Sequence, residues 1–248
     1  MHFLKTNQTP SRLPWWLYGT LFFTCVQVIS IGLSALAART RRAHPQPKPE
    51  IEVTPEDSKP PLKPPAATDT EAESFSASAA AFGEFSFYES LTQPRFAPPA
   101  PVFPVVWAIN NFLAIWGLLH VLRMPQDKVG RREFLACQGV SWLCYVSFGA
   151  LFFGLRSTLL GMVNTIIMLG ATLATVNIAL VRLRDTKAAL SQVTLVPWLL
   201  LAGPTATLIA LWNRDRLLQR GPFSQPPPRL AKSFQASQEN EPKSDVND

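Results

Sequence analysis

The sequence predicts an all-α integral membrane protein: a bundle of five transmembrane helices with a disordered proline-rich loop and a disordered C-terminal tail. Five long apolar runs carry this prediction, because a helix that crosses the hydrocarbon core needs about 20 apolar residues. Each run lacks charged side chains and is bounded by them. Most charges of the 248-residue chain lie in two blocks, residues 39–86 and 214–248, so charge and hydrophobicity are segregated along the chain.

The first apolar run extends over residues 15–38, between Arg12 and Arg39. Its last residues, Ser34 to Ala38, are small and are also typical of a signal-peptide cleavage site, so a retained helix and a cleaved signal are both open interpretations. The run is longer than the roughly 7–15 residues of a signal peptide's hydrophobic region. We therefore expect a retained first helix.

The other four helices are expected to pack as antiparallel neighbours, because only short links join them. Their predicted ranges are 101–122, 134–154, 157–181 and 190–212. Small residues inside them, such as Gly149, Gly161 and Gly170, allow the close backbone approach that helix packing in lipid requires. Amide side chains at membrane depth are predicted to hydrogen-bond between helices; these are Asn110, Asn111, Gln138, Asn164 and Asn177.

Two segments outside the helices are predicted to be disordered, residues 39–86 and residues 216–248. Both are rich in proline and polar residues and cannot bury enough apolar surface to offset the entropy of ordering. The expected organisation is residues 1–38 as N-terminus and first helix, 39–86 as loop, 87–215 as bundle and 216–248 as tail. The net charge of +6 does not indicate a nucleic-acid partner, because the arginines lie at helix ends, where lipid headgroups are.

A proline-rich motif stands directly before the second helix. It reads Phe87-Tyr88-Glu89-Ser90-Leu91-Thr92-Gln93-Pro94-Arg95-Phe96-Ala97-Pro98-Pro99, followed by Val102-Phe103 and Val106-Trp107. Two shorter motifs are Phe152-Phe153-Gly154 and Val196-Pro197-Trp198. On these residues the chain resembles the TspO/MBR family, the tryptophan-rich sensory proteins and translocator proteins. At some family positions the residue differs, as at Gln93, where the family has Lys.

The resemblance implies a five-helix membrane protein that binds or carries a hydrophobic planar ligand, either a porphyrin (tetrapyrrole) or a sterol-like molecule. Receptor and transport roles are both implied, in contact with the lipid bilayer and with a homodimer as a further expectation. The ligand-binding candidates are Tyr88, Phe96, Pro98, Pro99, Trp107, Asn111, Phe148, Phe152, Asn164 and Trp198.

Among these candidates Trp107 is the strongest, because an indole in a bundle cavity can stack on a flat ligand. Helix packing is the alternative role for this side chain. Prolines restrict the backbone, so residues 88–99 are predicted to form a stiff lid over the mouth of the bundle. We expect Phe96 of this lid to pack over the cavity bounded by Trp107.

The sequence predicts no enzyme, no metal site and no cofactor. It contains no catalytic triad, paired carboxylates or phosphate loop, and the apolar runs hold no carboxylate. His120 is expected at the membrane interface rather than as a haem ligand. Two alternatives are open: light-dependent porphyrin breakdown, which the resemblance implies, and a scaffold whose Pro60-to-Pro65 segment docks a protein as a polyproline helix.

Overall fold

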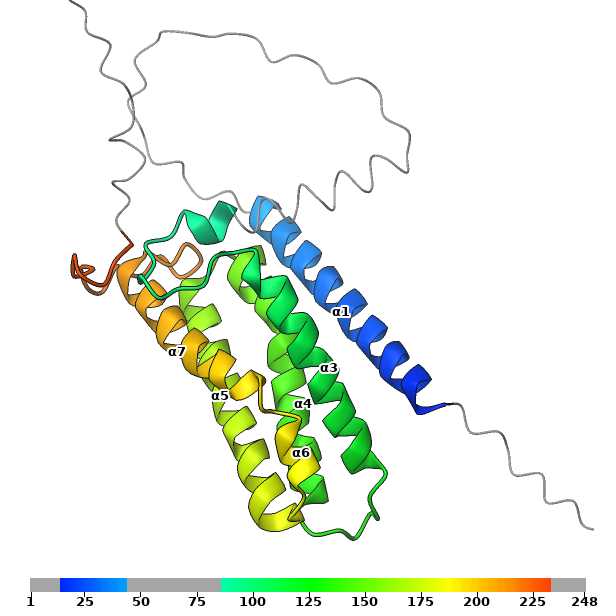
Figure 1. The fold of residues 1–248 in the computed structure, drawn as a ribbon. Helices are drawn as coiled ribbons and strands as arrows, with labels where there is room; N and C mark the ends of the chain where they lie inside the picture. Colours follow the sequence, from blue (N-terminus) through cyan, green and yellow to red (C-terminus); the bar gives the residue numbers. More distant parts are fainter. Residues whose placement is uncertain (1–13, 44–85, 233–248) are drawn as a thin grey trace, which may run out of the picture.

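The structure, a computed structural model, describes residues 14–43 and 86–232 of the chain (Figure 1). Five helical spans are long and apolar enough to cross a membrane, which confirms the predicted all-α, multi-pass membrane fold. The helices are α1 (Trp15–Ala43), α3 (Val102–Leu122), α4 (Arg131–Phe148), α5 (Thr158–Asn177), α6 (Thr186–Leu190) and α7 (Leu195–Trp212). Two π-helical turns extend α4 and α5, η1 (Gly149–Gly154) and η2 (Ile178–Leu183).

Helix α1 runs along one side of the bundle and packs on α4 and η1 through small residues (Figure 1). A Cβ atom added at Gly154 would lie 2.6 Å from the Cβ of Ala37, and one at Gly149 would lie 2.7 Å from the Oγ of Ser34. Such a close approach between helices is typical of small residues at a helix contact in lipid, and the retention of the first helix stays a prediction. Helix α1 also continues to Ala43, so the prediction of disorder from residue 39 was wrong for residues 39–43. No proline interrupts the helix there, because the first proline after residue 39 is Pro45.

The bundle has two ends. The end that carries residues 86–100, the end of α1 and the link between η1 and α5 is called the mouth end here (Figure 1). The opposite end carries the link between α3 and α4, together with α6. Helix α3 begins at Val102, as predicted, because the prolines before it cannot continue a helix in the N-terminal direction.

The last transmembrane helix is shorter than predicted. In place of one helix over residues 190–212, the chain forms α6, a turn, and α7 from Leu195. The Asp185 carboxylate caps α6 by accepting a hydrogen bond from the amide of Ala188 at 2.8 Å. The hydroxyl of Ser191 donates to the carbonyl of Ala188 at 2.7 Å, so local hydrogen bonds favour the turn over a continuous helix.

The segment after α7 is ordered as far as Lys232, which corrects the prediction of disorder from residue 216. It lies against residues 86–100 and pairs with them through the backbone: the amide of Arg95 donates to the carbonyl of Leu230 at 2.7 Å, and the amide of Lys232 donates to that of Gln93 at 2.9 Å. These hydrogen bonds pair backbone groups of two segments and so order a region whose composition alone predicts disorder. The remaining parts of the predicted disordered segments, including Pro60 to Pro65, lie outside the described residues.

Candidate functional site

A small cavity lies inside the bundle, among α3, α4, α5 and the first turn of α7. Its volume is about 10 Å³, which is room for about one water molecule. The cavity is lined by Trp107, Asn110, Asn111, Ala114, Gln138, Ser141, Trp142, Tyr145, Met168 and Leu195. Of the predicted ligand contacts, Trp107 and Asn111 therefore face the same space.

Aromatic rings make up one wall of this cavity. The ring centroids of Trp107 and Tyr145 are 5.0 Å apart, and those of Tyr145 and Trp142 are 5.7 Å apart. Trp142 in turn packs edge-on against Phe22 of α1 at 5.0 Å. The hydroxyl of Tyr145 donates to Oε1 of Gln27 at 2.9 Å, so the aromatic wall joins α1, α3 and α4.

Polar atoms make up the other wall. Asn110 and Gln138 are each only 1% exposed. Both polar atoms of the Asn110 side chain, Nε2 of Gln138, Oγ of Ser141 and Nε1 of Trp142 have no hydrogen-bond partner in the described part of the chain. A buried polar group without a partner costs about 1–3 kcal/mol. The cavity thus presents both donors and acceptors to whatever enters it.

The prediction that amides join the helices is met at Asn164. Its Nδ2 donates to the carbonyl of Cys144 at 2.9 Å and its Oδ1 accepts from the hydroxyl of Ser147 at 3.1 Å, which ties α5 to α4. The same prediction was wrong for Asn177, which is exposed on the last turn of α5. Asn164 therefore holds two helices together and does not line the cavity.

Residues 86–100, the segment predicted to be a lid and called the lid below, pack an aromatic face on the mouth end of the bundle. Phe87, Tyr88 and Leu91 belong to one apolar cluster with Phe152 and Ile209. The hydroxyl of Tyr88 donates to the carbonyl of Pro98 at 3.0 Å, and burial raises the pKa of Tyr88 to about 12. The lid is thus folded back on itself as well as packed on the bundle.

Phe103 connects the lid to the bundle interior. Its ring packs edge-on against Tyr88 at 5.2 Å and against Trp198 at 5.4 Å. Trp198 is buried in a cluster that Trp107 borders. Phe148 and Phe152 stack at 5.3 Å beneath the lid. Tyr88, Phe103 and Trp198 therefore form an aromatic path from the lid towards the cavity, whereas Phe148 and Phe152 pack with Phe87 of the lid.

Phe96 does not pack over the cavity, so that prediction was wrong. Its side chain is 43% exposed, and it does not line the cavity that Trp107 borders. The buried positions of the lid are taken by Phe87, Tyr88 and Leu91. The turn at Phe96 is fixed by the segment after α7, because the amide of the neighbouring Arg95 donates to the carbonyl of Leu230.

A second, larger hollow lies on the lid itself. It measures about 210 Å³ and is lined by Tyr88, Glu89, Leu91, Gln93, Pro99, Ala100 and Lys232. The Nζ of Lys232 donates to Oε1 of Gln93 and to the carbonyl of Ala97, each at 3.0 Å. Pro99 is exposed beside this hollow, whereas Pro98 is buried.

The sequence analysis predicted Asn110 and Gln138 only as links between helices, and it missed Ala114, Ser141, Trp142, Tyr145, Met168 and Leu195. A signal for part of this set was present: Gln138, Ser141, Trp142 and Tyr145 are spaced so that they share one face of a helix. A face that mixes amides and aromatic rings differs from a purely apolar packing face. The missed residues on α5 and α7 carry no such local signal, because tertiary packing alone places them at the cavity.

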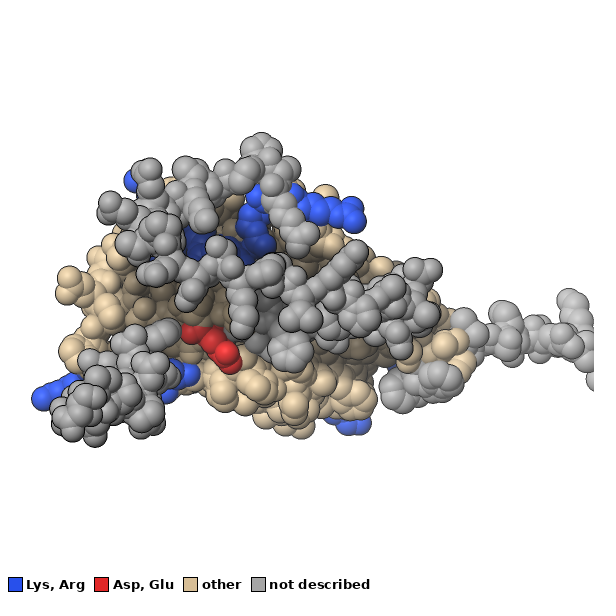
Figure 2. Space-filling view, turned by 90° about the horizontal axis from the view of Figure 1, so that it is seen from above, with Lys and Arg blue, Asp and Glu red and all other residues tan. Residues whose placement is uncertain are grey.

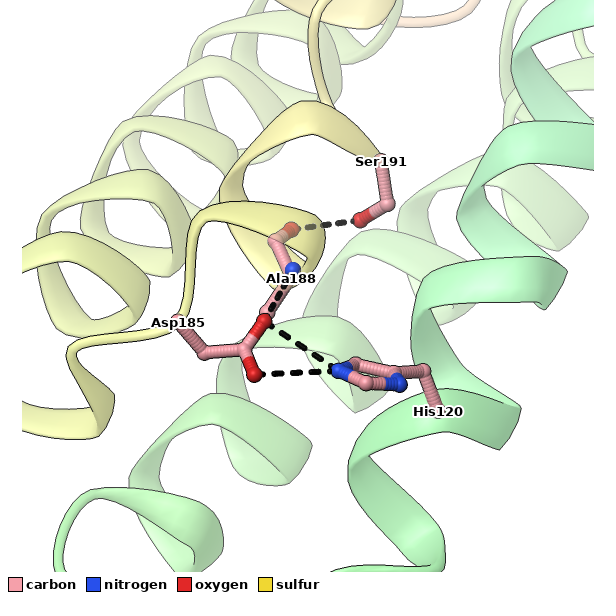
Figure 3. A network of polar contacts seen from close by, with 4 residues as sticks. All are labelled: His120, Asp185, Ala188 and Ser191. Atoms are coloured by element: carbon pink, nitrogen blue, oxygen red, sulfur yellow. Dashed lines mark hydrogen bonds and ion pairs between the residues drawn. The ribbon is translucent and has the colours of Figure 1, made fainter.

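A polar network closes the opposite end of the bundle (Figure 3). Nε2 of His120 lies 3.1 Å from both carboxylate oxygens of Asp185, which links α3 to the start of α6. Burial raises the pKa of Asp185, but the Ala188 amide and His120 outweigh that effect, so the pKa is lowered overall. Trp116 stacks on His120 with ring centroids 6.1 Å apart. None of these side chains lines the cavity, so the network acts as a clamp between helices.

Comparison with known proteins identifies one family. The sequence profile of the TspO/MBR family matches residues 58–212, which include the lid and the helices from α3 to α7. No curated protein matches the chain. The matched range covers more than half of the chain, and α1 precedes it. The homodimer implied by the resemblance stays a prediction.

Proposed function

Because the chain belongs to the TspO/MBR family, we propose that its bundle binds a hydrophobic planar ligand within the membrane, either a porphyrin or a sterol-like molecule. The observation that carries the proposal is the cavity at Trp107, which combines an aromatic wall with unpartnered amides. Ligand sites are typically apolar and aromatic with a few convergent polar groups. In this proposal the ring of the ligand stacks on Trp107 and Tyr145, and the amides of Asn110 and Gln138 bind its polar atoms.

The proposal requires the bundle to open. The cavity measures about 10 Å³, whereas sites for drug-sized ligands measure about 300–1,000 Å³. Helix α7 offers a place to bend beside the aromatic path: Pro204 has no amide proton for the carbonyl of Leu200, and Thr205 donates its hydroxyl to the carbonyl of Leu201 at 2.8 Å. We infer that α7 moves away from α3 when the ligand enters.

The lid gives the ligand a route in this proposal. Phe103 sits between Tyr88 of the lid and Trp198 of α7, so displacement of the lid would free the ring that separates the mouth from the interior. The side chains along this route are aromatic, which suits a flat apolar molecule. A carrier and a receptor both need such a route for the ligand, and the proposal covers both roles.

Porphyrin binding tests the proposal directly. Protoporphyrin IX is titrated into the full chain in a neutral detergent, and its Soret absorbance reports binding to the wild type, W107A and W116A. Loss of a stacking ring costs about 1–3 kcal/mol, so W107A is expected to bind about tenfold more weakly. W116A is the matched control, because Trp116 lies on the same helix but stacks on His120. Equal affinity of W107A and wild type would contradict the assignment of the cavity.

We propose binding without conversion of the ligand. The cavity holds no carboxylate or histidine among its lining residues that could transfer a proton. Illumination of the protein with protoporphyrin IX checks this point: the Soret band should decay no faster than for the porphyrin in detergent alone. A new absorbing product that forms only with wild-type protein would instead favour light-dependent breakdown.

A further inference from the structure

Arg41, Arg156 and Arg216 form an arginine cluster at the mouth end, and two of them lie over one aromatic ring. The guanidinium carbon of Arg156 lies 5.3 Å from the centroid of Phe87, and that of Arg216 lies 5.8 Å from it. Arg41 reaches the same region from α1 and donates from Nη1 to the carbonyl of Phe153 at 3.4 Å. Three separate elements supply these side chains: the end of α1, the link between η1 and α5, and the segment after α7.

Positive charge is concentrated in the arginine cluster. Burial, followed by the charges of Arg41 and Arg216, lowers the pKa of Arg156, which means that like charges share this space. Neither Arg156 nor Arg216 takes part in an ion pair with any described residue. The neighbouring carboxylate of Asp215 is fully buried and turned inwards to Ser157 and Leu159, at 2.6 Å and 2.9 Å. Figure 2, which views this end, shows several basic side chains here and acidic side chains beside them.

The backbone at Arg156 is held in an unusual conformation. Its φ angle is +54°, in the left-handed region that residues with a side chain rarely adopt. The turn is fixed on both sides: the amide of Leu155 donates to the carbonyl of Ala150 at 2.8 Å, and Ser157 caps α5. Such conformations persist where the surrounding structure imposes them, and they cluster at ligand sites. Here the turn places the guanidinium over Phe87.

We propose that Arg156 and Arg216 bind the phosphate group of an acidic phospholipid. Guanidinium groups form paired hydrogen bonds with phosphate oxygens, and converging arginines are suited to an anion that none of the described carboxylates supplies. The cluster lies where the helices end, which is the level of lipid headgroups. The Phe87 ring stabilises the cations from one side while the phosphate binds them from the other. The site is separate from the Trp107 cavity and does not depend on a ligand there.

Lipid retention in native mass spectrometry tests the proposal. The full chain in a neutral detergent is incubated with equal amounts of phosphatidylglycerol and phosphatidylcholine, and the bound lipid is counted for the wild type and R156N/R216Q. Asparagine is chosen at residue 156 because it tolerates left-handed backbone. The matched control is R214Q/R220Q, which removes the same charge from exposed arginines at the same end.

The wild type and R214Q/R220Q are expected to prefer phosphatidylglycerol, and R156N/R216Q to lose about tenfold of that preference. R216Q alone leaves the turn at Arg156 intact and is expected to lose about threefold, which keeps the test valid if the double variant unfolds. An excess of inorganic phosphate distinguishes a lipid headgroup from free phosphate as the bound anion. If phosphate alone displaces the lipid, the cluster binds free phosphate as well. Equal preference in R156N/R216Q and R214Q/R220Q, with R216Q matching the wild type, would overturn the proposal.

Discussion

The two ends of the bundle are built on different principles. The mouth end is assembled from pieces far apart in sequence, residues 86–100, the segment 213–232 and the arginine cluster, with a hollow of about 210 Å³ on the lid. At the opposite end, the short link between η2 and α6 is fixed to α3 by the contact between His120 and Asp185. There a Cβ atom at Gly117 would clash with Oγ of Ser191. The mouth end consists of segments that pack on one another and can separate, whereas the helices at the opposite end are interlocked by close contacts. We therefore expect the bundle to open at the mouth end.

The two ends also differ in the aspartate that joins their segments. Asp215 at the mouth is fully buried, whereas the side chain of Asp185 is 24% exposed. Asp215 accepts hydrogen bonds from Ser157, Leu159 and Leu218, so it joins α5 to the segment after α7. Asp185 joins α3 to α6. A buried carboxylate with several donors stabilises more than a partly exposed pair does.

Removal of the buried aspartate should have the largest effect. D215A leaves the Ser157 hydroxyl and two amides without their acceptor, and we expect a loss of about 3–5 kcal/mol of stability. The measurement is thermal unfolding in detergent. D127N is the control, because Asp127 is exposed in the link between α3 and α4, and its unfolding temperature should match the wild type. A D215A protein as stable as D127N would show that the mouth is not held together at this residue.

Filling the close contact at the opposite end should come next. G117A places a methyl group against Ser191, and overpacking of this kind costs about 1–3 kcal/mol. G170A is the matched control, since its added Cβ meets no atom within 4 Å and alanine favours the helix. We expect S191G to restore the stability of G117A. If G117A and G170A unfold at the same temperature, the opposite end is not interlocked.

Shortening the tail should have a moderate effect that is confined to the lid. A chain that ends at Arg229 loses the bond from the Arg95 amide to Leu230, the bond from Nε of Arg95 to Ala231 and the three bonds from Lys232. About 1 kcal/mol of local stability is lost per bond, so trypsin should cut after Arg95 at least about fivefold faster than in the full chain. Cleavage after Arg131, at the opposite end, serves as the internal control. Unchanged cleavage at Arg95 would separate the tail from the lid.

The exposed ion pair should give the smallest effect, and it should depend on pH. The pKa of Asp185 is lowered below its usual 3.8, so its contribution to stability is present above that pH and is lost as the pH falls through the lowered value. D185N keeps the cap of α6, because asparagine is an equally good cap, and removes only the charge next to His120. We expect D185N to lose less than about 1 kcal/mol near pH 7 and to approach the wild type below pH 3.8. A difference in stability between the two proteins that persists unchanged well below pH 3.8 would contradict this interpretation of the pair.

The sequence indicated the membrane fold well because lipid imposes simple rules on length and charge. It predicted where α3 begins, because Pro94 to Pro101 exclude a helix there. It failed where tertiary pairing decides: the order of residues 216–232 depends on bonds to Gln93 and Arg95, and the break before α7 depends on Ser191. Phe96 was placed by hydrophobicity alone, but the bonds to the tail turn it outwards.

The candidate site was predictable only in part. Trp107 came from its motif and Asn111 from its polarity at membrane depth, and both line the cavity. Ser141 and Trp142 share a helix face with Gln138, which a search for mixed faces would detect. The arginine cluster joins residues 41, 156 and 216, and no local pattern connects positions so far apart.

The central claim is that a planar ligand binds in the cavity at Trp107, and the paramagnetic effect of a manganese porphyrin on the indole N–H signals tests it most directly. Manganese(III) protoporphyrin IX is titrated into the full chain with labelled tryptophan, because a paramagnetic centre broadens only nearby nuclei. We predict that the signals of Trp107 and Trp142, which line the cavity, disappear first and that the signal of Trp116 beside His120 persists. Early loss of the Trp116 signal while those of Trp107 and Trp142 persist would contradict the account.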